Sequence, residues 1–314
     1  MIFYMKDQLE LRQMRHFLAV AETLHFGRAA KKLRMAQPNL SLQIRRIEKT
    51  LGYDLFIRTT RGVALTAAGV FLAARAGSLQ TSFDEAIQTA QRIADGQEGT
   101  LTVSFSGSAM YSQLPFVLDR FRQLYPKVEV QLREMYAYEQ QPLLLNGKLD
   151  VGFIRDGPPA QGLSMMPLSR EPFCAIFPQS HRFAKSSEPI APRELKDERF
   201  VLFTPRIARL AFERTLEVCT SGGFAPDIVL EAPQWVTIVS LVAAGMGISV
   251  APTSVKRLNI PGAVFRPLRS KGWSSIDVWT GEVHRSPSAS HLLAIAKEEF
   301  GGMLSNPSWR KPKA

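Results

Sequence analysis

The sequence has few of the residues that build covalent or metal-based structure. Only two cysteines, Cys174 and Cys219, occur among 314 residues, and they form neither a Cys-x-x-Cys spacing nor a cluster with histidines. This pattern disfavours a disulfide framework, a structural zinc site and an iron–sulfur centre. Two isolated cysteines are typical of buried thiols in a reducing compartment, and we expect neither a metal nor a cofactor.

Long apolar segments are also missing. The sequence has no run of about 18 apolar residues, the length that a membrane-spanning helix needs. Its first residues, MIFYMKDQLELRQ, acquire charge at Lys6 and Asp7, which is atypical of a signal peptide. We therefore expect a cytoplasmic protein without a membrane partner. Met1 and Met5 both remain candidates for the true start.

Catalytic signatures are absent as well. The sequence has no phosphate-binding glycine loop, no HExxH motif and no GxSxG motif, and its five histidines are scattered. The glycines of AAGMGISVAP (243–252) follow residues that have a helical pattern, so they do not form a dinucleotide fingerprint. These absences predict that the protein is not an enzyme.

Positive charge is present and unevenly distributed. The chain carries 39 Lys and Arg against 28 Asp and Glu, a net charge of +11, and residues 1–62 hold 12 of the former against 5 of the latter. A basic segment favours a polyanionic partner, most simply nucleic acid, although a solvated basic surface is the alternative. The length predicts two domains, and 45% hydrophobic and 21% charged residues are typical of a globular protein.

Residues 11–69 show three helical patterns followed by a short hairpin pattern. Apolar residues recur at helical spacing in each of the three stretches, and Pro38 suits the first turn of the third. Two short apolar runs then flank a polar turn that contains Gly62, which is typical of a wing. The order predicts a winged helix-turn-helix domain over residues 1–66. A small helical bundle with a merely hydrated polar face is the alternative.

The outward face of the third helix carries side chains that can read DNA. Gln and Asn pair with adenine through two hydrogen bonds, Ser bonds to either base type, and Leu contacts a thymine methyl. Basic residues further along the helix and at the wing tip fit phosphates or the minor groove. The predicted DNA-binding residues are Gln37, Pro38, Asn39, Ser41, Leu42, Arg45, Arg46, Arg58 and Arg61.

A long helix follows the wing. Residues 66–95 lack proline, and their apolar residues alternate by four and three positions, which is a heptad pattern. We predict a linker and dimerisation helix over residues 67–98, while the alternative is a stripe that packs on the C-terminal domain of the same chain. The residues expected to join two chains are Leu72, Leu79, Phe83 and Ile93.

Strand and helix patterns alternate through residues 99–304. Such alternation predicts an α/β domain with mostly parallel strand pairing. The order indicates one lobe of about 100–171 with 275–304 and a second of about 172–274, followed by a tail at 305–314. Two α/β lobes joined by crossover strands form a cleft in which small ligands bind.

Polar groups at strand ends and helix starts are expected to line this cleft. The segment Ser106–Ser108 offers hydroxyl and backbone N–H groups at a helix start, a suitable seat for a carboxylate, unless both serines are plain turn residues. Arg155 fits equally an acid in a second pocket or a neighbouring carboxylate. The effector-binding residues expected from this reasoning are Ser106, Ser108, Arg155, Phe203, Thr204, Pro205 and Gln234.

Over nearly its whole length the chain resembles the LysR-type transcriptional regulators. The pieces FGRAAKKL, QPNLSLQIRRIE and LTAAG stand in the family's order and spacing, and the FLAVAE and LHFGRAA stretches are similar to regulators of aromatic-compound degradation. The resemblance implies DNA contacts at Gln37, Pro38, Ser41 and Arg58. It also implies an effector domain similar to periplasmic binding proteins. Relatives usually carry Arg or Gln at the position of Leu42, so their operator preference does not transfer there.

The same resemblance implies a mode of action. Homodimers, paired into a homotetramer, bind double-stranded promoter DNA. A small organic acid that binds between the lobes changes the spacing of the DNA-binding domains (the heads), and the complex then recruits RNA polymerase. It adds effector contacts at Tyr136 and Ala137, the latter replacing a Thr of relatives that bind ring-cleavage acids. We expect an activator that responds to an aromatic or ring-cleavage acid. The alternatives are a repressor of the same family and an α/β small-molecule-binding protein or enzyme with an accessory docking head.

Overall fold

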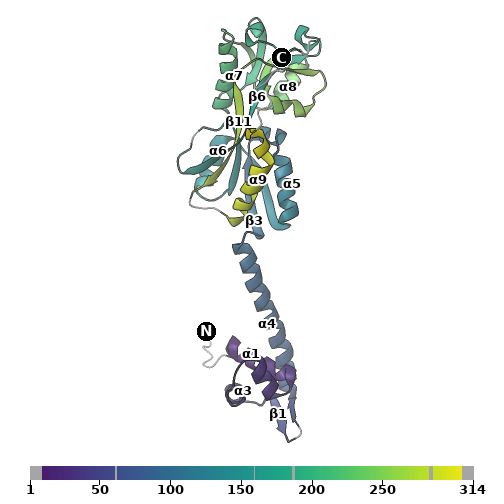
Figure 1. The fold of residues 1–314 in the computed structure, drawn as a ribbon, viewed down its shortest axis with the longest axis vertical. Helices are drawn as coiled ribbons and strands as arrows, with labels where there is room; N and C mark the ends of the chain where they lie inside the picture. Colours follow the sequence, from purple (N-terminus) through teal and green to yellow (C-terminus); the bar gives the residue numbers. More distant parts are fainter. Residues whose placement is uncertain (1–8, 61, 159, 186–187, 283–285, 306–314) are drawn as a thin grey trace, which may run out of the picture. The chain divides into compact units, whose positions relative to one another are not determined.

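The computed structural model describes residues 9–60, 62–158, 160–185, 188–282 and 286–305, and of the predicted tail residues 306–314 lie outside this set. It divides into two compact units, residues 1–91 and 92–314, which are described separately (Figure 1). Within the described residues no helix combines the length and the apolar character needed to cross a membrane. The functional boundaries at residues 66 and 98 remain predictions.

The first unit consists of three short helices, a two-stranded hairpin and the greater part of a long helix. Its elements are α1 (Leu11–Thr23), α2 (Phe26–Lys32), α3 (Gln37–Leu51), β1 (Phe56–Thr59), β2 (Gly62–Leu65) and α4 (Ala67–Ala94). Helix α3 has a proline in its first turn and ends at Gly52, whose φ of 80° is the left-handed value that glycine adopts freely. These signals explain why α3 begins and ends at these residues.

The core of this unit is formed by apolar residues that repeat at helical spacing. Phe17 and Val20 of α1 and Leu40, Ile44 and Ile47 of α3 have no exposed surface. Each such side chain contributes about 1.5–3 kcal/mol of hydrophobic stabilisation. Because α3 buries this one stripe, its opposite face is left to solvent.

The second unit is an α/β structure built on a mixed sheet. Its strands are β3 (Glu98–Phe105), β4 (Lys127–Glu134), β5 (Val151–Arg155), β6 (Leu163–Pro178), β7 (Arg199–Phe203), β8 (Asp227–Ala232), β9 (Ser249–Pro252), β10 (Ala263–Pro267) and β11 (Trp273–Gly281). Its α-helices are α5 (Leu114–Leu124), α6 (Ala137–Leu145), α7 (Arg209–Ser221), α8 (Trp235–Ala243) and α9 (Pro287–Ser305). The strand order is β10-β6-β11-β5-β3-β4, with β9 also paired to β6 and with β7 paired to β8.

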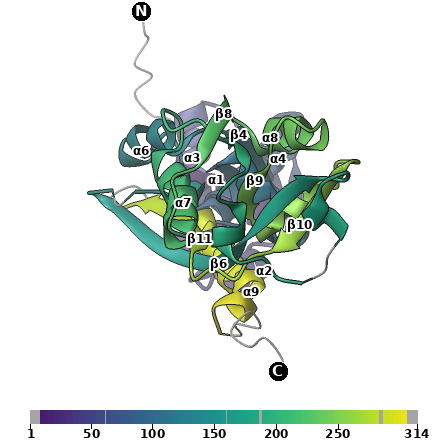
Figure 2. The ribbon, with the colours of Figure 1, turned by 90° about the horizontal axis from the view of Figure 1, so that it is seen from above.

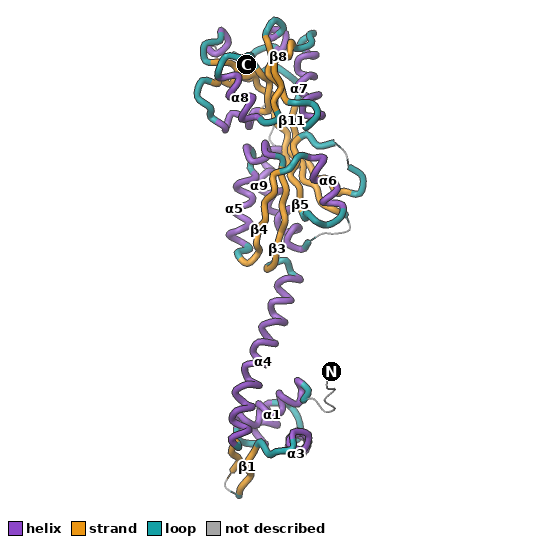
Figure 3. Tube along the Cα trace, turned by 180° about the vertical axis from the view of Figure 1, so that it is seen from behind, coloured by secondary structure: helices purple, strands orange, loops and turns teal. Residues whose placement is uncertain are grey.

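Strand β6 divides this unit into two lobes. Its first part pairs with β11 in lobe I, which holds β3–β5, α5, α6 and α9, and its last part pairs with β9 and β10 in lobe II, which holds α7 and α8. Helix α6 lies on one side of the lobe I strands and α5 and α9 lie on the other (Figure 3). Helices α7 and α8 flank the strands of lobe II (Figure 2). This two-lobed architecture confirms the predicted fold class.

The prediction of mostly parallel pairing is wrong. Parallel ladders join β3 to β4, β3 to β5 and β7 to β8, whereas β6 pairs antiparallel with β9, β10 and β11, and β11 pairs antiparallel with β5. The reason is that β11 returns through the sheet beside the long β6, and this arrangement depends on contacts distant in sequence.

The two cysteines are buried, as the sequence predicts. Burial raises the pKa of the Cys174 thiol to about 12 and that of the Cys219 thiol to about 11, so both thiols stay protonated at neutral pH.

Candidate functional site

The predicted DNA-reading residues of α3 lie on its solvent side. Because Leu40, Ile44 and Ile47 take the buried positions, the remaining faces of the helix stay accessible. The side chains exposed there are Gln37, Pro38, Asn39, Leu42, Arg45 and Arg46, while Ser41 is half-buried beside them. The start of α3 therefore presents amide and hydroxyl groups, and its later turns present guanidinium groups.

A buried carboxylate, that of Glu48, ties α3 to the wing. One of its oxygens accepts hydrogen bonds from the backbone N–H groups of Leu55 and Phe56, at 3.0 and 3.1 Å, and the other lies 2.9 Å from a guanidinium nitrogen of Arg58. These bonds satisfy donors at the start of β1 and compensate the burial of the charge. The sequence reasoning did not identify Glu48, although an acid on the apolar stripe of α3 was a signal.

Arg58 is held close to the predicted DNA-reading face of α3. Its guanidinium donates to the hydroxyl of Ser41 at 3.4 Å and lies 4.9 Å from the ring centroid of Phe26. The wing and the helix are thus fixed relative to each other before any ligand binds. Arg61, the other predicted wing contact, lies outside the described residues.

Helix α4 carries exposed apolar side chains over most of its length. Near its start, however, Leu72 and Ala73 pack against the core of the first unit, and Ala76 is buried. Leu79, Phe83 and Ile93 are 61%, 42% and 49% exposed, and all residues from 81 to 88 are exposed. An apolar stripe of this extent is unusual on a solvent-facing helix and is typical of a surface that another chain covers.

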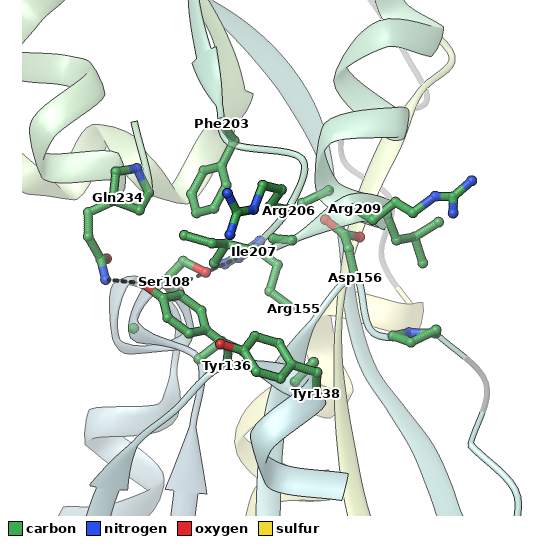
Figure 4. A pocket seen from close by; sticks show the side chains of 18 of the residues that line it. Ser108, Tyr136, Tyr138, Arg155, Asp156, Phe203, Arg206, Ile207, Arg209 and Gln234 are labelled. Carbon is green, nitrogen blue, oxygen red and sulfur yellow. Dashed lines mark hydrogen bonds between the residues drawn. The ribbon is translucent and has the colours of Figure 1, made fainter. Parts of the chain in front are cut away.

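A cavity of about 490 Å³ lies between the two lobes of the second unit (Figure 4). Its size and its mostly apolar lining are typical of sites for small molecules. Of the predicted effector-binding residues, those that line it are Ser106, Ser108, Tyr136, Ala137, Arg155, Phe203 and Gln234. Thr204 and Pro205 are not among the lining residues, and the N–H of Thr204 bonds to the carbonyl of Ala232.

Further lining residues follow β7, beyond Thr204 and Pro205, at which the predicted set ends. They include Arg206, Ile207 and Arg209, together with Asp156 after β5 and Trp235 at the start of α8. No spacing rule marks them, because the loop after β7 and the first turn of α7 fold back along the cavity. Among the described residues no group of three or more His, Cys, Asp or Glu is placed to hold a metal ion.

The serine segment after β3 differs from the prediction. Ser106 and Ser108 were expected at the start of a regular helix, but a short 3-10 helix (Gly107–Tyr111) follows Ser106, and α5 begins only at Leu114. The backbone N–H of Ser106 donates to the carbonyl of Phe153. The segment therefore lines the cavity without offering the N-terminus of a long helix.

Arg155 lies at the base of the cavity with its side chain 3% exposed. Its guanidinium donates to the carboxylate of Glu171 at 2.5 Å, to the hydroxyls of Ser108, Ser254 and Ser274 at 3.1 Å each, and to the carbonyl of Ser108 at 3.2 Å. The guanidinium has five N–H donors, so these five bonds occupy them all. Of the two roles left open for Arg155, the structure shows pairing with a neighbouring carboxylate.

Asp156 adds a second buried charge to the same cluster. Its carboxylate accepts hydrogen bonds from the hydroxyl of Ser274 at 2.7 Å and the N–H of Ser275 at 2.8 Å, and lies 3.2 Å from Arg214 of α7. Burial raises the pKa of Asp156, and the neighbouring Arg155 partly opposes that rise. The cluster joins the end of β5 to both crossover strands and to lobe II.

Aromatic side chains from both lobes face the cavity. The rings of Tyr136 and Tyr138 in lobe I are stacked at 5.9 Å, and those of Phe203 and Trp235 in lobe II lie 5.4 Å apart. The side-chain amide of Gln234 donates to the hydroxyl of Tyr136 at 3.4 Å and so links the lobes (Figure 4). Flat apolar ligands fit such walls.

Comparison with known proteins matches both parts of the chain to one family. Residues 11–70 match the model described as "Bacterial regulatory helix-turn-helix protein, lysR family", and residues 94–301 match the LysR substrate binding domain. The regulator IlvR of Caulobacter vibrioides is 39% identical over 300 residues, 93% of this chain and 98% of the relative. The Hca operon transcriptional activator HcaR of Escherichia coli is 33% identical, covering 95% and 100%.

A solved structure shares the fold of most of the chain. The full-length regulator CbnR, solved in complex with its target DNA, has a TM-score of 0.79 and 26% sequence identity over 92% of this chain and 99% of its own. The relatives found are transcriptional regulators and not enzymes, which removes the interpretation as an enzyme with a docking head. The chain belongs to the LysR family of DNA-binding transcriptional regulators.

Proposed function

We propose that the protein is an activator whose binding to double-stranded promoter DNA responds to a small organic acid, aromatic or derived from an aromatic. The observation that carries this proposal is the cavity between the lobes, which is walled by aromatic rings and lined by Arg206, an arginine that pairs with no carboxylate among the described residues. The same chain also presents a recognition-type helix. Its size is that of a small-molecule site.

The DNA contacts are assigned to the start of α3 and to the wing. Gln37, Asn39 and Ser41 offer hydrogen bonds to base edges, and Leu42, 49% exposed, offers an apolar contact to a thymine methyl. The guanidinium groups of Arg45 and Arg46 and the wing arginines serve phosphates, which position the head without reading sequence. The structural similarity to a regulator solved on its target DNA supports this assignment.

The assembly is assigned to the apolar stripe of α4. Two such stripes packed together form a homodimer that holds two heads at a fixed spacing, as two half-sites on DNA require. Leu72 packs on the core of its own unit, so the contact between chains begins further along the helix, near Leu79. Pairing of dimers into a homotetramer remains a prediction from the family resemblance.

Regulation follows from ligand binding between the lobes. An acid that binds the closed arrangement of the lobes more tightly than the open one shifts the balance between them. The shift alters the spacing of the heads and hence the contact of the bound complex with RNA polymerase. The proposal that the response activates transcription, and does not repress it, is supported by the relative HcaR, which is named as an activator.

Competition binding to DNA tests the proposal. Purified protein is titrated onto the intergenic DNA upstream of its own gene and onto random DNA of equal length, at low and moderate salt. We expect a preference of at least about a thousandfold for the upstream site that persists at moderate salt. Equal affinity for both DNAs with a steep salt dependence would contradict sequence-specific regulation.

A further inference from the structure

We propose that Arg206 binds the carboxylate of the effector and that the cavity selects planar monocarboxylates. The inference rests on the proposed function, since it names the chemistry of the ligand at the same site. It follows from the three arginines that line the cavity, which differ in how many of their donors are already used.

Arg155, the residue that the sequence favours as an acid partner, has no donor left for a ligand. All five of its N–H groups bond to Glu171, to three serine hydroxyls and to a backbone carbonyl. A ligand carboxylate could bind it only by displacing one of these five buried partners, which would then need another donor. Arg155 is therefore a structural cation of the cleft floor.

Arg209 is occupied by its own helix. Its guanidinium lies 2.7 Å from Glu213 one turn along α7, and its side chain is 85% exposed. Figure 4 shows the side chain extending away from the other cavity residues. Its charge is thus neutralised locally and directed to solvent.

Arg206 remains as the cation that is free to bind a ligand. Within the described parts of the chain no carboxylate pairs with it, and Figure 4 draws its side chain among the cavity residues, near Phe203 and Ile207. It precedes the first turn of α7, whose N-cap Ala208 supplies no side-chain hydrogen bond. The positive end of that helix dipole adds to the guanidinium charge on this side of the cavity.

The opposite side, at Ser106–Ser108, is unfavourable for an anion. The carboxylate of Glu134 packs so closely against Gly107 that a side chain there would collide with it. A ligand carboxylate placed here would face the negative charge of Glu134, whereas on the lobe II side it faces Arg206.

The remaining lining determines the shape and charge of the ligand. Tyr136 and Phe203 supply aromatic faces from the two lobes, and an aromatic ring held between them leaves one edge for a carboxylate at Arg206. A second carboxylate on the ligand would meet only neutral polar groups or the arginines that already pair with carboxylates, so its charge would be desolvated without a free cation among the described lining residues. The cavity therefore favours one carboxylate on a flat ring over a dicarboxylate.

Calorimetric titration of the full-length protein tests this assignment. Benzoate, its uncharged analogue benzamide and the planar dicarboxylate cis,cis-muconate are titrated into the wild type, Arg206→Gln and the matched control Arg193→Gln, which removes an exposed lobe II arginine that does not line the cavity. We expect benzoate to bind the wild type and the control alike, and Arg206→Gln at least about tenfold more weakly, because a charge-assisted hydrogen bond is lost. Benzamide affinity should not change between the variants, and muconate should bind the wild type less tightly than benzoate.

Three results would overturn the inference: equal benzoate affinity in Arg206→Gln and the wild type, tighter binding of muconate than of benzoate, or no benzoate binding by the wild type. Arg206 makes no structural bond in the described chain, so the variant should melt at the wild-type temperature. Binding of the same preparations to the upstream DNA is measured in parallel. If the wild type binds the upstream DNA specifically but does not bind benzoate, only the ligand assignment is rejected. If the wild type shows no preference for the upstream DNA, the proposed function is rejected.

Discussion

Replacing Arg155 by methionine tests whether the buried ion cluster stabilises the second unit. Methionine keeps an apolar stem of similar length but removes five hydrogen bonds and the cation between Glu171 and Asp156, whose side chains are 18% and 1% exposed. Breaking a buried ion pair by removing one partner costs about 3–5 kcal/mol, because the other charge stays buried without compensation. We expect a decrease of that size in the free energy of unfolding at neutral pH.

The loss should depend on pH in a defined direction. Burial raises the pKa of Asp156 in the folded state, and Arg155 opposes that rise, so its removal raises the pKa further. A carboxyl whose folded pKa exceeds its unfolded value binds protons more tightly when folded, so stability falls as pH rises through the interval between the two values. The deficit of the variant should therefore shrink as the pH is lowered from neutral toward the ordinary carboxyl range.

Urea unfolding followed by tryptophan fluorescence measures this deficit. Residues 1–91 contain no tryptophan, so the signal reports on the second unit. Arg209→Met is the matched control, because it removes an exposed arginine that pairs only along its own helix, and it should leave the midpoint unchanged. A deficit below about 1 kcal/mol for Arg155→Met, or one that is constant with pH, would refute the reasoning.

Three further predictions concern the first unit and α4. Ser41→Ala should weaken binding to the upstream DNA by up to roughly tenfold, and to random DNA much less, in a filter-binding or anisotropy assay; equal losses would remove Ser41 from base reading. Leu79→Glu with Phe83→Glu should lower the mass measured by light scattering, because two exposed apolar positions become charged, and an unchanged mass would contradict the dimerisation stripe. Gly69→Ala should destabilise the first unit by about 1–3 kcal/mol in thermal melting followed by circular dichroism, since its Cβ would lie 2.2 Å from a backbone oxygen. Gly77→Ala in the same helix meets no neighbour and should be neutral or stabilising, so equal effects of the two would argue against the packing explanation.

Local patterns made the first unit predictable from its sequence. The spacing of Leu40, Ile44 and Ile47 determines which face of α3 is buried, and Pro38 and Gly52 mark its ends. These are interactions within one helix or between close neighbours in sequence. The fold class and the exposed start of α3 could therefore be deduced without coordinates.

Features that depend on distant contacts were not accessible in the same way. The antiparallel course of β6 beside β11 joins segments about a hundred residues apart, and no local periodicity reports it. Arg155 ends the buried strand β5 and Arg206 follows β7, and only their partners in the folded chain distinguish the arginine with free donors from the one whose donors are all used. Which arginine of the cavity is free to bind an anion could therefore be seen only in the three-dimensional structure.

The central claim is that an acid bound between the lobes changes how the heads contact promoter DNA. Nuclease footprinting of the full-length protein on its upstream DNA, with and without a panel of aromatic monocarboxylates, tests it most directly. We expect a specific protected region whose length or internal cleavage pattern changes when a binding acid is added. A specific footprint that stays identical while the acid is shown by calorimetry to be bound would contradict the coupling.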